Sequence, residues 1–171
     1  MRTRRMALHR ALGNSSLILV LLFVVSGLLI VHDMLTRDGS FAKVFGPRLA
    51  FADLSTVLYF VFTYAMAIYY RNNVQLHARF MVCNALPLIP PALVRALHGF
   101  LPAMTFNQRL HACFTVSELI TLALLYNDTR PGKVRASYLI LLGVLLVQHA
   151  SFVWALQFGP WRAVVTWIVA L

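Results

Sequence analysis

Long apolar runs dominate the pattern of hydrophobic and polar positions along the chain, and polar segments separate them. An α-helix rises about 1.5 Å per residue, so about 20 apolar residues cross the hydrocarbon core of a bilayer. Runs of this length predict an all-α fold, a polytopic transmembrane helix bundle. The five predicted spans are residues 15–32, 53–70, 77–98, 108–126 and 137–158.

The connection between the first two runs, residues 32–52, is the longest of the predicted connections. It contains Gly39, Gly46 and Pro47, which are turn-forming residues, together with charges of both signs. This composition predicts a loop that carries at most a short surface helix. Asp53, at the end of the segment, is a suitable N-cap for the second span.

The two ends of the chain differ from the central bundle, residues 15–158. Residues 1–14 carry several arginines and are predicted to lie along the membrane surface. Residues 159–171 begin with Gly159-Pro160 and continue with an apolar tail that is too short to cross a bilayer. Trp161 and Trp167 favour the membrane interface, so this tail is predicted to be an interfacial or partial helix.

The third run, residues 77–98, combines bilayer length with polar residues at regular spacing. Steps of four and three place these residues on one face of a helix, which is expected to turn inward because ionisable side chains are costly in lipid. Pro87, Pro90 and Pro91 remove backbone donors and predict a kink in the same span. The residues of this face are His77, Met81, Asn84, Leu88, Pro91, Arg95 and His98.

Composition supports the membrane assignment. Of the 171 residues, 60% are hydrophobic and 12% are charged, whereas a soluble domain has about 25% charged residues. The net charge of +10 comes from basic residues at span ends and in short loops, where they meet lipid head groups, so nucleic acid is not expected as a partner. Counting basic residues by side gives nine against six, which favours a cytoplasmic N-terminus.

Several polar residues within or at the ends of the predicted spans form a candidate intramembrane site. Within the bilayer Glu118 is expected to be protonated, paired or in contact with water; Arg95 is the first candidate partner, followed by His149. Such a group fits either a proton relay or solute contact in a small-solute or proton-coupled carrier, or else an ion pair that locks two spans together. The site residues are Asn84, Arg95, His98, His111, Glu118 and His149.

A second candidate site is formed by His9 and His77, which open two spans that rise from the same side. Two histidines at equal depth are the ligands of a six-coordinate haem b, and Arg79 could pair with a propionate. This arrangement would serve electron transfer or a redox-assembly role. The alternative is that both histidines bind head groups or backbone carbonyls at the membrane surface.

Other chemistry has little support in the sequence. A zinc or copper site from His98, His111 and Cys113 has no compact ligand motif. The chain lacks a glycine-rich phosphate loop, a nucleophile elbow and an H-E-x-x-H sequence, so no catalytic residue is assigned and an enzyme is the less favoured interpretation. Small residues such as Ser26-Gly27 offer a helix-packing face, which also allows a homo-oligomer or a membrane-protein assembly partner.

Short motifs give the chain a resemblance to a known group. Residues 8–13 read L-H-R-A-L-G, Ser26-Gly27 lies in the first span, and residues 76–81 read L-H-A-R-F-M ahead of Pro91 and Arg95. This pattern resembles the bacterial predicted membrane proteins of domain of unknown function family 2306, over about residues 8–97. The resemblance implies a multi-span helical protein of the bacterial cytoplasmic membrane, with a histidine pattern similar to that of haem-binding b-type cytochromes.

Overall fold

The computed structural model describes the backbone of residues 2–129 and 136–170, and their side chains except those of residues 2–12 and 14. Five helical segments are long and apolar enough to cross a membrane, and a short helix follows them, so the predicted fold class is confirmed. The elements are α1 (Arg2–Thr36), α2 (Ser40–Tyr69), α3 (Val74–Ala85), the 3₁₀ turn η1 (Leu86–Leu88), α4 (Ile89–Phe100), α5 (Phe106–Thr129), α6 (Ala136–Trp154) and α7 (Gly159–Val169).

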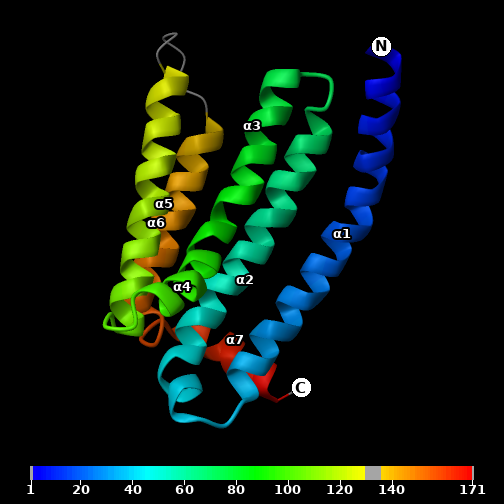
Figure 1. The fold of residues 1–171 in the computed structure, drawn as a ribbon. Helices are drawn as coiled ribbons and strands as arrows, with labels where there is room; N and C mark the ends of the chain where they lie inside the picture. The colour runs from blue at the N-terminus through cyan, green and yellow to red at the C-terminus, as the bar shows by residue number, and fades with distance from the viewer. Residues whose placement is uncertain (1, 130–135, 171) are drawn as a thin grey trace.

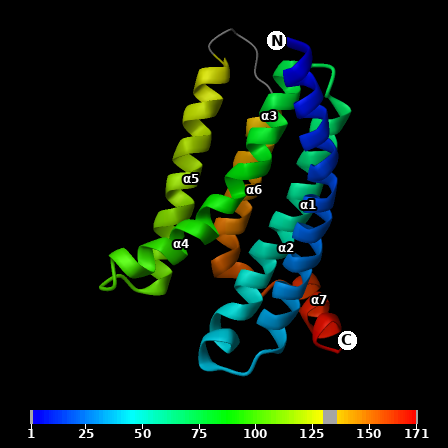
Figure 2. The same cartoon turned by 45° about the vertical axis from the view of Figure 1, so that its right-hand side comes forward.

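The spans run side by side, and α2 lies between α1 on one flank and α3, α5 and α6 on the other (Figure 1). The start of α1 and the turn from α2 to α3 lie at one end of the bundle, whereas α7 and the turn from α4 to α5 lie at the other (Figures 1 and 2). The core is built by α2 to α6 around the fully buried side chains of Leu141, Leu145, Cys83 and Cys113. Both cysteines therefore serve as small apolar core residues.

The prediction of a long loop at residues 32–52 is wrong. Helix α1 continues to Thr36 and α2 already begins at Ser40, so Asp53 lies inside a helix and is not its N-cap. Gly46 and Pro47 are turn signals in the sequence, yet both lie within α2. Their role is packing: Gly46 lets the backbone of α1 approach closely, and the Pro47 carbonyl accepts a hydrogen bond from α7.

The C-terminal helix α7 is too short to cross a bilayer, as expected from its length. Trp161 is packed inside the protein, however. It is buried against Phe51, and its indole N–H donates to the Pro47 carbonyl at 2.9 Å. Trp167 is 63% exposed and is the tryptophan available to the interface.

The prolines break the third span where the sequence predicts a kink. Helix α3 ends at Ala85, the turn η1 contains Pro87, and α4 starts with Pro90 and Pro91 in its first turn. Figure 2 shows α4 leaving the direction of α3 and running towards the start of α5. This change of direction opens space between α2, α4, α5 and α6.

Candidate functional site

Three ionisable side chains of α5 and α6 form a continuous hydrogen-bonded chain. His149 Nδ1 lies 2.8 Å from Glu118 Oε1, and His149 Nε2 lies 2.8 Å from His111 Nδ1. His111 and Glu118 are seven residues apart, two helical turns, and therefore lie on the same face of α5. His149 on α6 fills the gap between them.

More than one arrangement of protons satisfies the two contacts of this chain. In one, an ionised Glu118 accepts from His149 Nδ1–H, and His149 Nε2 accepts from His111 Nδ1–H; in another, a protonated Glu118 donates to His149 Nδ1, and His149 Nε2–H donates to His111 Nδ1. An imidazole can take up a proton at one nitrogen and release one at the other. The chain can therefore pass a proton from the end of the bundle at His111 to Glu118, about halfway along α5.

The partner of Glu118 is thus the second of the two residues expected from the sequence. Arg95 makes no ion pair with Glu118 among the residues that the structure describes. Glu118 pairs with His149 instead, and the side chains of His149 and Glu118 are mostly buried, at 21% and 14% exposed. The Phe114 ring stacks on the His149 ring at a centroid distance of 5.3 Å, which shields one face of the imidazole.

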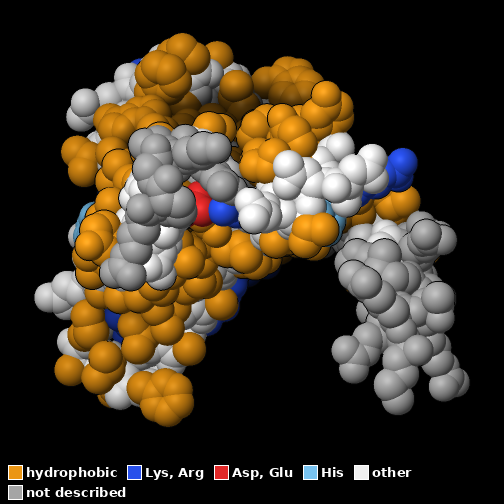
Figure 3. All heavy atoms as spheres, turned by 90° about the horizontal axis from the view of Figure 1, so that it is seen from above, with side chains coloured by type: hydrophobic (Ala, Val, Ile, Leu, Met, Phe, Trp, Pro, Cys, Tyr) orange, Lys and Arg blue, Asp and Glu red, His pale blue; other side chains and the backbone are white. Residues whose placement is uncertain are grey.

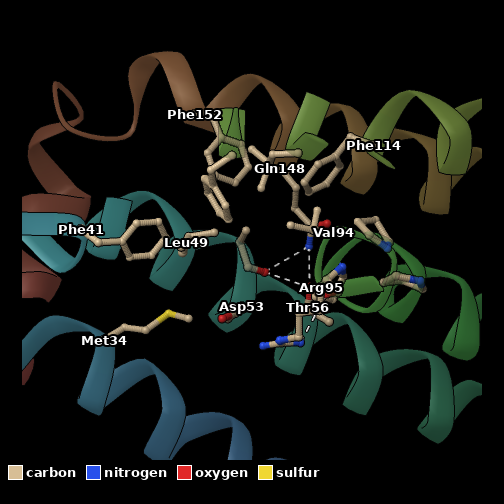
Figure 4. Close-up of a pocket in the computed structure, with 16 residues that line it drawn as sticks. Met34, Phe41, Leu49, Asp53, Thr56, Val94, Arg95, Phe114, Gln148 and Phe152 are labelled. Carbon is tan, nitrogen blue, oxygen red and sulfur yellow. Dashed lines mark hydrogen bonds between the residues drawn. The ribbon is translucent and has the colours of Figure 1, made fainter. Parts of the chain in front are cut away.

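A pocket of about 250 Å³ lies beside this chain, where α2, α4, α5 and α6 converge (Figure 4). Its walls are mostly apolar, and Asp53 and Arg95 are the charged residues that line it. Phe114 and Gln148 line the pocket as well, and Gln148 is the neighbour of His149 in sequence. The pocket and the proton chain consequently share a wall.

Gln148 fixes that wall to α2. Its side chain is buried, and its Nε2 donates to the Ala52 carbonyl at 3.3 Å, to Ser55 Oγ at 2.9 Å and to Thr56 Oγ1 at 3.0 Å. An amide in the membrane interior needs such partners because lipid offers none. Neither Gln148 nor Asp53 is among the site residues predicted from the sequence, although a polar residue within an apolar run is a signal that both offer.

The predicted polar face of the third span is divided by the break at η1. Asn84 is buried and accepts a hydrogen bond from Thr63 Oγ1 at 3.0 Å, so it links α3 to α2. Arg95 and His98 are exposed on α4. Arg95 lines the pocket, whereas His98 does not. The structure therefore does not bring the two ends of this face into one site.

Arg79 forms an ion pair with Asp128 of α5. Arg79 Nε donates to Asp128 Oδ1 at 2.9 Å and to Oδ2 at 3.0 Å, and Nη2 donates to Oδ1 as well. The two side chains are 16% and 11% exposed. Figure 3, seen from the end of the bundle where α1 begins, shows an acidic group beside a basic one within a mostly hydrophobic surface.

The residues of the predicted haem site are only partly described. His77 Nδ1 lies 2.8 Å from the Ala67 carbonyl, which holds its ring at the start of α3. His9 belongs to α1, but its side chain lies outside the described residues. The haem assignment to His9, His77 and Arg79 stays a prediction. Within the described part of the chain, no group of three or more His, Cys, Asp or Glu side chains could hold a metal ion.

Comparisons with known proteins give no relative for this chain: no protein family, no curated protein and no solved structure matches it.

Proposed function

We propose that this multi-span membrane protein is a proton-coupled carrier of a small solute in a bacterial cytoplasmic membrane, with its N-terminus inside. The observation that carries the proposal is the hydrogen-bonded chain of His111, His149 and Glu118 beside a pocket between the spans. A carboxylate and two histidines on two adjacent spans are costly in lipid, and this cost supports a function in the membrane interior.

The shared wall couples the pocket to the proton chain. A solute in the pocket contacts Phe114, whose ring covers one face of His149, and Gln148, which precedes His149 on α6. A shift of Phe114 or of Gln148 would move the His149 ring relative to Glu118. Solute binding in the pocket is then linked to proton binding by the His111–His149–Glu118 chain. A bound solute changes the proton affinity of the chain, and a bound proton changes the solute affinity of the pocket by the same factor.

The broken third span supplies a second feature that supports transport. Carriers commonly place their sites where a span is discontinuous, because broken helices offer unpaired backbone groups and a point of bending. The pocket is lined by Pro87, Pro90 and Pro91 at this break. A bend at η1 would move α4, and with it Arg95, relative to α2.

Replacing Glu118 with glutamine is expected to reduce solute-driven proton movement by about 100-fold or more, because the chain loses its proton acceptor. The measurement uses proteoliposomes that contain a pH-sensitive dye and a panel of cationic, anionic, zwitterionic and neutral solutes. Thr115→Ala is the matched control, since Thr115 is exposed on the same helix and its hydroxyl bonds to the His111 carbonyl of its own helix. Equal proton movement in Glu118→Gln and wild type, or none with any solute, would contradict the proposal.

Haem b binding by His9 and His77 is the second candidate. The contact from His77 Nδ1 to the Ala67 carbonyl favours it, because haem and metal ligands of this type are oriented by a hydrogen bond at the other ring nitrogen. Protein from haem-replete expression is expected to show a Soret band that His77→Ala removes and His98→Ala retains. A wild-type protein without this band, or a band unaffected by His77→Ala, would rule the candidate out.

A further inference from the structure

The pocket between α2, α4, α5 and α6 carries one charge of each sign. Asp53 comes from α2 and Arg95 from α4, and they are the ionisable side chains among its lining residues. Figure 4 shows both on the side of the pocket opposite Phe114 and Phe152. We infer that the pocket binds a zwitterion with an apolar substituent, an inference that rests on the proposed carrier function and names the class of its solute.

The positive charge of Arg95 attracts Asp53 across the pocket, but neither side chain forms an ion pair within the described part of the chain. Arg95 Nη1 donates a long hydrogen bond of 3.4 Å to the Pro91 carbonyl, one helical turn earlier. A carboxylate between helices without a donor is unfavourable. A ligand ammonium at Asp53 and a ligand anion at Arg95 would remove this cost on both sides.

The other polar residues of the pocket already have partners. Gln148 Nε2 donates to three acceptors on α2, and the Thr56 hydroxyl donates to the Ala52 carbonyl. They shape the wall and leave charge recognition to Asp53 and Arg95. The opposite wall includes the rings of Phe114 and Phe152. This wall fits an alkyl or aryl group, which completes the chemistry of the ligand.

Two sources provide this chemistry. A free amino acid with an apolar side chain has an ammonium, a carboxylate and an apolar substituent. A phosphatidylethanolamine headgroup has an ammonium and a phosphate joined to acyl chains. L-Leucine and phosphatidylethanolamine are therefore the two probes, and the inference is that the pocket recognises the pair of opposite charges that both contain.

The test measures binding of radiolabelled L-leucine to the full chain in phosphatidylcholine nanodiscs. Two analogues each lack one charge: 4-methylpentanoate has no ammonium, and 3-methylbutylamine has no carboxylate. Both are expected to bind about tenfold or more weakly than leucine, since a hydrogen bond between charged groups is lost. In a second arm, native mass spectrometry of protein from phosphatidylethanolamine-containing discs shows whether that lipid is retained.

Variants connect the binding to the two residues. Asp53→Asn is expected to weaken leucine binding, or lipid retention, about tenfold or more while leaving the affinity for 4-methylpentanoate unchanged. Arg95→Gln is likewise expected to weaken leucine binding, or lipid retention, about tenfold or more while leaving the affinity for 3-methylbutylamine unchanged. Asp38→Asn and Arg71→Gln are the controls, since both residues are exposed outside this pocket. The analogue comparison on wild-type protein decides the question even where a variant does not fold.

The inference is overturned if the analogues bind as tightly as leucine, if the two variants bind leucine and retain the lipid as wild type does, or if neither probe binds. Its failure differs from that of the carrier proposal. Leucine binding without proton movement would overturn the carrier function alone. Proton movement driven by a solute with only one charge would overturn this inference alone. Retention of phosphatidylethanolamine without leucine binding would support the inference with lipid as the source.

Discussion

Asp128→Asn is expected to lower the free energy of unfolding by about 1–3 kcal/mol, the cost of leaving one partner of a part-buried, hydrogen-bonded ion pair without its counter-charge. The guanidinium of Arg79 is held by both carboxylate oxygens of Asp128. Arg79 Nη1 is already buried without a hydrogen-bond partner within the described part of the chain. Loss of the carboxylate charge would leave the whole guanidinium without compensation, at a contact that joins α3 to α5.

The measurement is reversible unfolding of the detergent-solubilised protein, followed by circular dichroism. Asp33→Asn is the matched control, because the Arg37–Asp33 pair is 67% and 57% exposed and such pairs contribute at most about 1 kcal/mol. The double variant Arg79→Leu, Asp128→Leu should recover much of the loss, since it leaves no buried charge. Similar stability changes for Asp128→Asn and Asp33→Asn would show that the ion pair is effectively solvated.

Gly46→Ala is expected to destabilise the packing of α1 on α2 by about 1–3 kcal/mol, the range for overfilling a packed site. A Cβ atom at Gly46 would lie 2.6 Å from the backbone carbonyl oxygen of Met34. Because that atom belongs to the backbone, no rotamer change relieves the clash, and the end of α1 must move away. Gly27→Ala should also be destabilising, because its Cβ would lie 2.5 Å from Val57 Cγ2, and a buried helical valine is confined largely to one rotamer.

Thermal unfolding in detergent measures this effect, and Gly143→Ala is its control. Nothing lies within 4 Å of a Cβ at Gly143, which is inside α6. Alanine has the higher helix propensity, so this control should be neutral or stabilising by up to about 1 kcal/mol. If Gly46→Ala were as stable as Gly143→Ala, the close approach of α1 to α2 would not hold in the protein.

Much of the fold could be predicted from the sequence, because lipid imposes a simple rule of length and hydropathy. The runs ending near His32 and Tyr70 and the break at Pro87 follow from that rule and from the chemistry of proline. The rule says little about helices that extend beyond the membrane. The start of α2 was missed for this reason: Gly46 and Pro47 suggest a loop locally, whereas contacts to α1 and α7 hold them in a helix.

The candidate site was only partly predictable. Residue spacing placed His111 and Glu118 on one face, but the choice of partner for Glu118 depended on how α5 packs against its neighbours. Helix α6 lies beside α5 and brings His149 to Glu118, whereas the bend at η1 turns Arg95 towards Asp53 and the pocket. The resemblance to domain of unknown function family 2306 and the haem assignment stay predictions.

Helices α1 and α5 differ in how apolar they are, and this difference bears on how the chain enters the bilayer. The most apolar stretch of α1 has a mean hydropathy of 2.5, and that of α5 has 1.3. During synthesis, α1 can therefore partition into lipid as soon as it emerges from the translocation machinery. Helix α5 carries Glu118 and Asp128, whose partners lie on α6 and α3. Its release into lipid is expected to wait until α6 has been synthesised, so that α5 and α6 insert together as a hairpin.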